Sequence, residues 1–300
     1  MRIITRGDMD GLASSVLLTT VENVREIAFV HPKDAQDGLV NATKDDILVN
    51  LPYVKGCGMW FDHHVSEEEK AQKAQKVTDF KGLYKIAPSA ARVVYDFYKS
   101  PKFAPYAKML EAIDRFDSGQ LTIDDVNNPK GWILLAYTID PRTGLGPEFQ
   151  KYFRWMVEYV KELPIEKVLE HREVKKRIDK VRKEEAEFKC LLEKSCTIDG
   201  TVIITDLRIF NEIPTGNRFL VYTLFPKANV EVRIFRGKDK DKIIIACGHS
   251  IFNRTCKVNL GKMLAGYGGG GHAGAGTCQV PVDKADSIIK EIVARLKENK

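Results

Sequence analysis

The sequence lacks the features that mark membrane, secreted and zinc-stabilised proteins. No apolar run is long enough to span a bilayer, and the apolar stretch at the N-terminus is too short for a signal peptide. The six cysteines form no CxxC pair and no zinc-like spacing, which favours reduced thiols over a disulfide framework or a structural zinc site. These absences predict a cytoplasmic protein that does not act at a membrane.

Concentrated charge is also missing. The formal net charge of +6 comes from lysines and arginines spread along the chain, without a basic tail or a low-complexity segment. A mild basic excess suits a small anionic substrate and speaks against a long nucleic acid as the partner. The hydrophobic fraction of 44% is ordinary for a globular protein. Because 300 residues is about twice the usual domain length, two domains are expected.

The first part of the chain alternates short apolar runs with helical patterns. Strands are predicted over residues 3–5, 27–30, 47–50 and 58–61, and helices over 12–20, 90–98, 106–113, 132–139 and 152–159. Strands alternating with helices predict an α/β domain with a mainly parallel sheet and helices on both faces, covering residues 1–163. Ligands of such sheets gather at the carboxyl ends of the strands.

A heavily charged segment with a thin apolar stripe follows Pro164 and predicts a long linker helix over residues 164–195. From residue 196 the pattern changes. Strands are predicted over 201–205, 229–235, 243–248 and 277–280, and helices over 217–225, 260–264 and 285–297. We therefore expect a smaller α/β C-terminal domain over residues 196–300.

Two polar motifs follow predicted strands of the first domain. In residues 6–11 (RGDMDG), Asp8 and Asp10 would face the same side if both left the strand in extended conformation. Carboxylate oxygens suit Mg²⁺ or Mn²⁺, while a solvated loop or helix cap is the alternative. In residues 61–64 (FDHH), one histidine could bind a metal and the other face a substrate, with Asp62 fixing a tautomer. Chance histidines of a surface loop are the alternative.

Two further motifs carry candidate chemistry. Residues 113–119 (IDRFDSG) end a predicted helix, where either Asp114 or Asp117 could complete a metal site. The helix dipole disfavours a carboxylate at that end, so an offsetting charge is expected. Residues 267–276 (YGGGGHAGAG) give a backbone that can approach a phosphate closely. A flexible linker is the alternative, which the position of this motif inside a domain disfavours.

In this order and spacing the four motifs resemble those of the DHH phosphoesterases with their DHH-associated C-terminal domain. The resemblance covers nearly the whole chain. Residues 50–53 (NLPY) and 140–146 (DPRTGLG) are similar to the exopolyphosphatase-like branch of that family. Each motif alone is a modest signal, whereas four in the right order are specific.

The resemblance implies a manganese- or magnesium-dependent hydrolase with its active site in the cleft between the two domains. The implied metal ligands are Asp8, Asp10, His63 and Asp117, and His64 would face the scissile phosphate. The implied substrate-binding residues are Arg254, Asn259, Gly269, Gly270, Gly271 and His272. The metal would lower the pKa of a bound water and offset charge on the phosphoryl oxygens.

Two positions depart from the family pattern. The first motif of the family usually begins with a histidine ligand, where this chain has Arg6, and the second usually presents an aspartate shared by two metals, where this chain has Asn50. A guanidinium cannot ligate a metal, and an amide oxygen is neutral. We therefore expect one well-occupied metal site, with Arg6 and Asn50 taking part in catalysis and Arg6 standing where a second cation would be.

The leading hypothesis is hydrolysis of a phosphodiester or phosphoanhydride bond in a short oligonucleotide, a nucleotide derivative or polyphosphate. The alternative is a catalytically weakened or silent nucleotide sensor of the same fold, because Arg6 and Asn50 replace ligands. The retained ligand set argues against complete loss of activity. An exonuclease of long nucleic acid is disfavoured, since no further nucleic-acid domain is present. The sequence leaves a homodimer open.

Overall fold

The computed structural model describes residues 1–64, 80–237 and 241–299, which form two compact units. The first comprises Met1–Gln120 with Pro129–Asp179, and the second comprises Leu121–Asn128 with Lys180–Lys300. No helix in the described part of the chain is long and apolar enough to cross a membrane.

A five-stranded sheet forms the centre of the first unit, with every neighbouring pair parallel in the order β2-β1-β3-β4-β5. The strands are β1 (Arg2–Thr5), β2 (Glu26–Phe29), β3 (Asp46–Val49), β4 (Met59–Asp62) and β5 (Lys81–Tyr84). The first four were predicted, but β5 was not, because its sequence KGLY lacks an apolar run. Its Gly82 has a φ of +132°, and a Cβ there would lie 2.1 Å from the Trp60 carbonyl oxygen.

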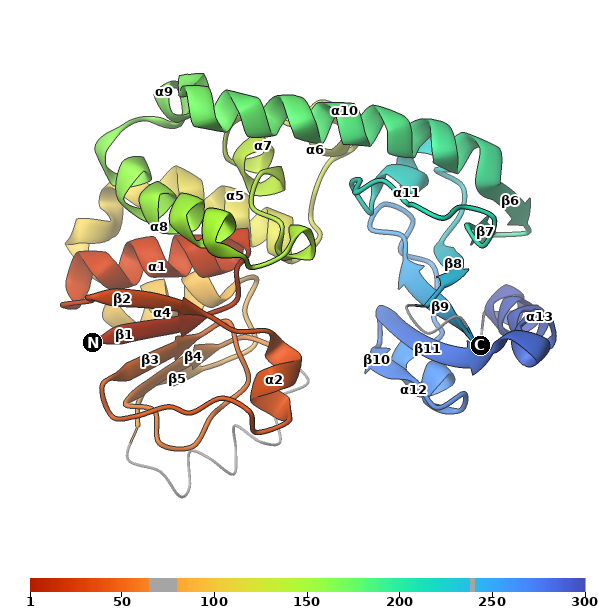
Figure 1. The fold of residues 1–300 in the computed structure, drawn as a ribbon, viewed down its shortest axis with the longest axis horizontal. Helices are drawn as coiled ribbons and strands as arrows, with labels where there is room; N and C mark the ends of the chain where they lie inside the picture. Colours follow the sequence, from red (N-terminus) through yellow and green to blue (C-terminus); the bar gives the residue numbers. More distant parts are fainter. Residues whose placement is uncertain (65–79, 238–240, 300) are drawn as a thin grey trace. The chain divides into compact units, whose positions relative to one another are not determined.

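The long helices of the first unit pack on one face of this sheet. The helices and turns are α1 (Met9–Val21), α2 (Pro32–Gln36), α4 (Ala90–Tyr98), η2 (Pro101–Tyr106), α5 (Ala107–Asp117), α7 (Gly131–Tyr137), η3 (Pro141–Thr143), α8 (Pro147–Glu162) and α9 (Ile165–Glu170). Figure 1 shows α1 and α8 together along one side of the sheet, where Ile3, Val49 and Phe61 share their core. Helices were predicted on both faces. Among the described residues, the opposite face instead packs against loops, around Leu48 and Trp60.

An ion pair links the first residues of the neighbouring strands β1 and β3. Arg2 Nε donates to Asp46 Oδ1 at 2.8 Å, and Thr43 N donates to Asp46 Oδ2 at 2.7 Å. Burial opposes ionisation of Asp46, but the hydrogen bonds from Arg2 and Thr43 outweigh it and lower the pKa of this carboxyl from 3.8. A lowered folded pKa stabilises the fold above the unfolded pKa, and this contribution is lost as the pH falls through the folded pKa.

Asp46→Asn is therefore expected to lower the free energy of unfolding of the first unit by about 1–3 kcal/mol at pH 7. The difference from wild type should shrink below the ordinary Asp46 pKa of 3.8. Urea unfolding can be followed by tryptophan fluorescence, because all three tryptophans lie in the first unit. The exposed neighbour Asp45 gives the control, Asp45→Asn. An equal effect of both variants, or a difference that persists unchanged at pH 3, would contradict this role.

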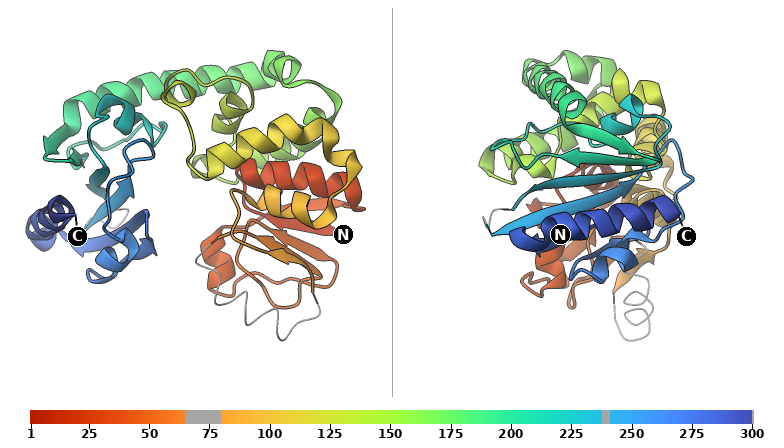
Figure 2. Two further views of the ribbon diagram at one scale, coloured as in Figure 1. Left: turned by 180° about the vertical axis from the view of Figure 1, so that it is seen from behind. Right: turned by 90° about the vertical axis from the view of Figure 1, so that its right-hand side faces the viewer.

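The second unit contains a mixed six-stranded sheet in the order β10-β11-β9-β8-β7-β6. Its elements are α6 (Ile123–Asn127), β6 (Cys196–Asp199), β7 (Val202–Asp206), α11 (Leu220–Leu224), β8 (Val230–Arg236), β9 (Lys242–His249), α12 (Leu260–Ala265), β10 (Gly270–His272), β11 (Ala275–Pro281) and α13 (Val282–Glu298). Helices α12 and α13 share a core with one face of the sheet, and Figure 2 shows α13 alongside the strands. The fold class is α/β, as predicted.

Two predicted segments differ in detail. The linker predicted over residues 164–195 consists of α9 and α10 (Arg172–Ser195), with a break at His171. The backbone of His171 is extended, and its ring lies 4.6 Å from the ring of Trp155. The glycine motif, predicted as a loop, is partly a strand: β10 pairs antiparallel with β11, so that His272 lies opposite Ala275. The glycines therefore build a hairpin.

Candidate metal centre and active site

Asp8 and Asp10 do not leave β1 as alternate residues of an extended strand, so that part of the sequence argument was wrong. Helix α1 begins at Met9, and Asp8 is its N-cap, with Oδ1 accepting from Gly11 N at 2.9 Å. Asp10 is buried in the first helical turn. A Cβ on Gly11 would lie 2.1 Å from the Arg6 carbonyl oxygen, so the turn requires glycine. Because helix α1 starts at this point, the two carboxylates have different hydrogen-bond partners.

Asp10 is fixed by the N-terminus of α4. Its Oδ2 accepts from Ala90 N at 2.8 Å and its Oδ1 from Ala91 N at 2.9 Å. Burial and the negative charges of Asp117 and Asp8 raise the pKa of Asp10 well above its ordinary value, although these backbone hydrogen bonds oppose the rise. A carboxylate held beside two others in this way gains from a bound cation, which favours its charged form.

His63 faces two of these carboxylates. Its Nδ1 lies 3.0 Å from the Ala87 carbonyl oxygen, which can only accept, so Nδ1 carries the hydrogen and leaves the lone pair on Nε2. That Nε2 lies 3.6 Å from Asp10 Oδ2 and 3.4 Å from Asp117 Oδ2. It is buried and has no hydrogen-bond partner among the described residues. Such a nitrogen is prepared to bind a metal.

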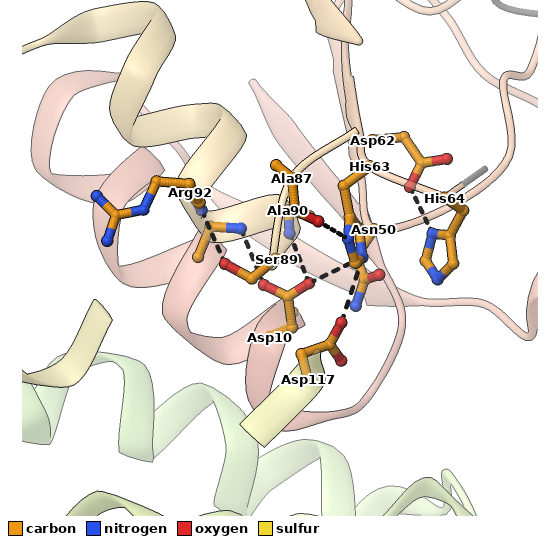
Figure 3. Close-up of polar contacts among 12 residues, drawn as sticks. Asp10, Asn50, Asp62, His63, His64, Ala87, Ser89, Ala90, Arg92 and Asp117 are labelled. Carbon is orange, nitrogen blue, oxygen red and sulfur yellow. Dashed lines mark hydrogen bonds and ion pairs between the residues drawn. The ribbon is translucent and has the colours of Figure 1, made fainter. Parts of the chain in front are cut away.

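The geometry distinguishes the two aspartates near the end of α5, which the sequence left open. Asp114 accepts from Ser89 Oγ at 2.6 Å and from Arg92 Nε at 2.8 Å, so its charge is already compensated. Asp117 is the last residue of α5 and points toward His63 (Figure 3). The ligand atoms of Asp10, His63 and Asp117 lie within 4.8 Å of one another. Asp117 is thus the carboxylate placed to hold an ion.

Asp8 has different partners. Its Oδ1 accepts from Asn50 Nδ2 at 2.9 Å, and its Oδ2 lies 3.1 Å from Arg6 Nε. Burial raises the pKa of Asp8, and the charge of Arg6 opposes that rise. Asn50 follows β3 with a φ of +58°, a left-handed conformation that asparagine tolerates better than most residues. Both oxygens of Asp8 are therefore already engaged by Arg6 and Asn50.

His64 is paired with Asp62. The His64 Nδ1 lies 2.8 Å from Asp62 Oδ1, and Figure 3 shows this pair pointing away from the Asp10 side of the site. Burial acts to lower the pKa of His64, but the hydrogen bond and charge of Asp62, with the charges of Asp117 and Asp10, raise it to about 9. Asp62 thus fixes the ring of His64, rather than the tautomer of His63, whose Nδ1 bonds to Ala87.

The implied substrate-binding residues all lie in the second unit. Asn259 is the N-cap of α12, with its Oδ1 accepting from Lys262 N at 3.0 Å, and Arg254 Nε donates to the Ile251 carbonyl at 3.0 Å. His272 is at the tip of the β10–β11 hairpin, where its Nδ1 accepts from Gly274 N at 3.2 Å.

The glycines of this hairpin are required for packing. A Cβ on Gly269 would lie 2.1 Å from the Thr277 carbonyl oxygen, and one on Gly271 would lie 2.3 Å from the Ala275 carbonyl oxygen. Gly270 has open space around its Cβ position. Close backbone packing thus explains Gly269 and Gly271, but it does not explain Gly270.

The sequence did not predict several residues of the site, because these residues contact it through backbone atoms. The Ala87 carbonyl fixes the tautomer of His63, and the N–H groups of Ala90 and Ala91 fix Asp10. Ser89 caps α4 by accepting from Arg92 N at 3.0 Å. A serine before an apolar helical run is a cap signal that agrees with the predicted helix start at residue 90, but it does not indicate the contact of this helix with Asp10.

The residues fit a hard divalent cation. An imidazole nitrogen without a hydrogen-bond partner and two carboxylates converge at the carboxyl ends of parallel strands, where burial and then the charges of Asp117 and Asp8 raise the pKa of Asp10. Asp10, His63 and Asp117 would hold the ion. The described residues also include a second group, Asp62, His63 and His64, but there the Asp62–His64 hydrogen bond already uses two of the ligand atoms.

The chain matches no protein-family model and no curated protein. Among solved structures it is similar to the pGpG-specific phosphodiesterase PggH from Vibrio cholerae, with 36% identity, coverage of 100% of this chain and 99% of that chain, and a TM-score of 0.86. It is similar in fold to an exopolyphosphatase-related protein from Bacteroides fragilis, with 10% identity, coverage of 99% and 92%, and a TM-score of 0.55. RecJ from Thermus thermophilus in complex with Mn²⁺ shares 15% identity, with coverage of 99% and 51% and a TM-score of 0.52.

Proposed function

This chain belongs to the DHH family of phosphoesterases, and from that premise we propose that it hydrolyses the phosphodiester bond of a linear dinucleotide of the pGpG type. It is a phosphoric ester or anhydride hydrolase, as expected from its motifs. The pGpG specificity of PggH, which is 36% identical over the full length, supports this substrate class. The silent-sensor alternative has less support, because a sensor has no need of an unpartnered His63 Nε2 facing two carboxylates.

The single observation that supports the proposal most strongly is that His63 Nε2 has no hydrogen-bond partner among the described residues. We propose that Asp10, His63 and Asp117 hold one Mn²⁺ or Mg²⁺ ion. Such an ion offsets charge on phosphoryl oxygens and lowers the pKa of a bound water. In this proposal Asp8, which the resemblance implies as a fourth ligand, holds Arg6 and Asn50 in place, and its contacts to both residues support this role. The Arg6 guanidinium supplies a fixed positive charge to an equatorial phosphoryl oxygen, while Asn50 positions Asp8 and so orients Arg6.

His64 has the role of contacting the scissile phosphate. Asp62 holds its Nδ1, which leaves Nε2 available to a phosphate oxygen. The His64 side chain is 39% exposed, so a substrate can reach it, whereas His63 is 9% exposed. The buried histidine therefore serves the ion and the accessible one the substrate.

In the second unit, Arg254, Asn259 and the hairpin of Gly269, Gly270, Gly271 and His272 bind the rest of the substrate. Arg254→Gln is expected to raise KM for the dinucleotide about tenfold with little change in kcat, because it removes a contact to a phosphate that does not react. Steady-state kinetics would measure this. Arg295→Gln, on the exposed side of α13, is the control. A fall in kcat with unchanged KM would contradict the binding role.

Turnover of a defined panel tests the function. Purified protein with Mn²⁺ is offered pGpG, a cyclic dinucleotide, a nucleotide 3′,5′-bisphosphate and polyphosphate, and products are separated by chromatography. We expect pGpG to be cleaved to mononucleotides and the reaction to be lost in Asp10→Ala. Cleavage of polyphosphate or bisphosphate in preference to pGpG would overturn the substrate class. Binding without turnover of any compound would instead favour the sensor. We further propose that the protein acts in the cytoplasm on this small substrate, without a long nucleic acid as partner.

A further inference from the structure

We propose that Trp60 and Tyr84, here called the aromatic pair, are positioning residues that hold the backbone beside Asn50, after β3, and at His64, after β4. Their contacts go to the backbone beside Asn50 and at His64, and their effect on catalysis rests on the proposed function of those residues. Neither ring belongs to the group of candidate ligands.

Tyr84 acts on the backbone at His64, just after β4. It lies opposite Asp62 in the register of β4 and β5, and its hydroxyl donates to the His64 carbonyl oxygen at 2.9 Å. His64 is two residues beyond the last residue of β4, where pairing between strands no longer fixes the backbone. The Tyr84 hydroxyl therefore fixes the backbone position of His64, and with it the position of the His64 imidazole.

Trp60 acts on the loop after β3. Its ring is fully buried, and its Nε1 donates to the Leu51 carbonyl oxygen at 2.9 Å. Leu51 directly follows Asn50, which has a φ of +58° and whose N–H donates to the Phe61 carbonyl at 3.1 Å. A left-handed residue needs support from its surroundings. The Phe61 carbonyl and the Trp60 indole give that support from two sides.

The two rings form one unit. Trp60 and Tyr84 stack with centroids 5.6 Å apart and an interplanar angle of 13°. The Tyr53 ring packs on Trp60 at 5.3 Å, on the sheet face opposite the long helices. A shift of one ring is therefore transmitted to the other, so Asn50 and His64 keep their spacing around Asp8 and the metal ligands.

The polar atoms of the aromatic pair are what distinguish positioning from simple packing. Phenylalanine at position 84 would keep the ring but offer no donor to the His64 carbonyl, whereas phenylalanine at position 60 would remove the donor to Leu51 and also leave part of the indole's space empty. In both cases the donor reaches a residue in or next to the site. The pair therefore couples the core on this face of the sheet to the geometry of the active site.

Tyr84→Phe keeps the stacked ring and removes one hydrogen bond. We expect kcat for pGpG to fall about five- to tenfold, with KM within about twofold, because a hydrogen bond of ordinary strength no longer holds His64. The matched control is Tyr98→Phe, which removes a hydroxyl bond to Glu22 at 2.7 Å in the same unit. Both variants should lower the melting temperature similarly, but Tyr98→Phe should keep the wild-type kcat.

Hydrogen exchange separates this inference from the proposed function. The Asn50 amide, bonded to Phe61, should exchange about fivefold faster in Trp60→Phe than in Tyr98→Phe. If wild type cleaves no member of the panel, the proposed function fails, and exchange at Asn50 still decides whether the pair holds the backbone beside it. Equal kcat values in Tyr84→Phe and Tyr98→Phe, together with equal exchange at Asn50 in Trp60→Phe and Tyr98→Phe, would show that the pair contributes only packing and would overturn the proposal.

Discussion

His63→Ala is expected to abolish tight Mn²⁺ binding and to lower kcat/KM for pGpG by about a thousandfold or more. His63 supplies the nitrogen of the proposed ligand set, and its Nδ1–H is already committed to the Ala87 carbonyl. Without the imidazole, only the two carboxylates of the proposed ligand set remain, on Asp10 and Asp117. Calorimetric titration with Mn²⁺ and steady-state kinetics would measure the two effects.

The control for this prediction is His31→Ala. His31 caps the short helix α2 through its Nδ1, and its removal changes the number of histidines equally. We expect wild-type metal affinity and activity in that variant. If His63→Ala binds Mn²⁺ as tightly as wild type does, the ion lies elsewhere and the proposed site is wrong.

Wild-type protein is expected to bind one Mn²⁺ per chain, and the double substitution Arg6→His with Asn50→Asp is expected to raise this to two. In wild type both oxygens of Asp8 are engaged, by Asn50 at 2.9 Å and by Arg6 at 3.1 Å. A permanent positive charge at Arg6 also repels a second cation. The double variant removes that charge and adds an imidazole nitrogen and a carboxylate, which together with Asp8 form a ligand set suited to a divalent ion.

Equilibrium dialysis followed by metal analysis gives the number of ions per chain. Arg142→His is the control, because Arg142 is an arginine of the same unit that is already paired with Asp140. It should leave one ion per chain. Two tightly bound ions in wild type would show that Asp8 leaves Arg6 and Asn50 to bind metal, and would contradict the single-ion account.

Much of the first unit could be predicted because its elements are marked by local pattern. Four of the five strands are short apolar runs, and polar motifs follow β1 and β4. Since parallel strands end at one edge, the convergence of residues after β1 and β4 follows from topology alone. The family resemblance then named the same residues, and the structure brings Asp10, His63 and Asp117 together.

The rest depends on contacts that sequence patterns do not encode. The separation of Asp8 from Asp10 follows from a helix that starts at Met9, three residues before the predicted start at residue 12, because Asp8 caps it. The choice of Asp117 over Asp114 depends on Arg92, which lies 22 positions from Asp114 in the sequence. β5 was missed because Gly82 interrupts its apolar pattern, although this strand supplies Tyr84. Long-range partners and backbone donors decide these details.

Anomalous diffraction at the manganese edge, from crystals equilibrated with Mn²⁺, tests the central claim most directly. The account predicts one strong peak in contact with His63 Nε2 and with the carboxylates of Asp10 and Asp117, while Asp8 keeps its contacts to Arg6 and Asn50. A strong peak bound elsewhere, or none at His63, would contradict it.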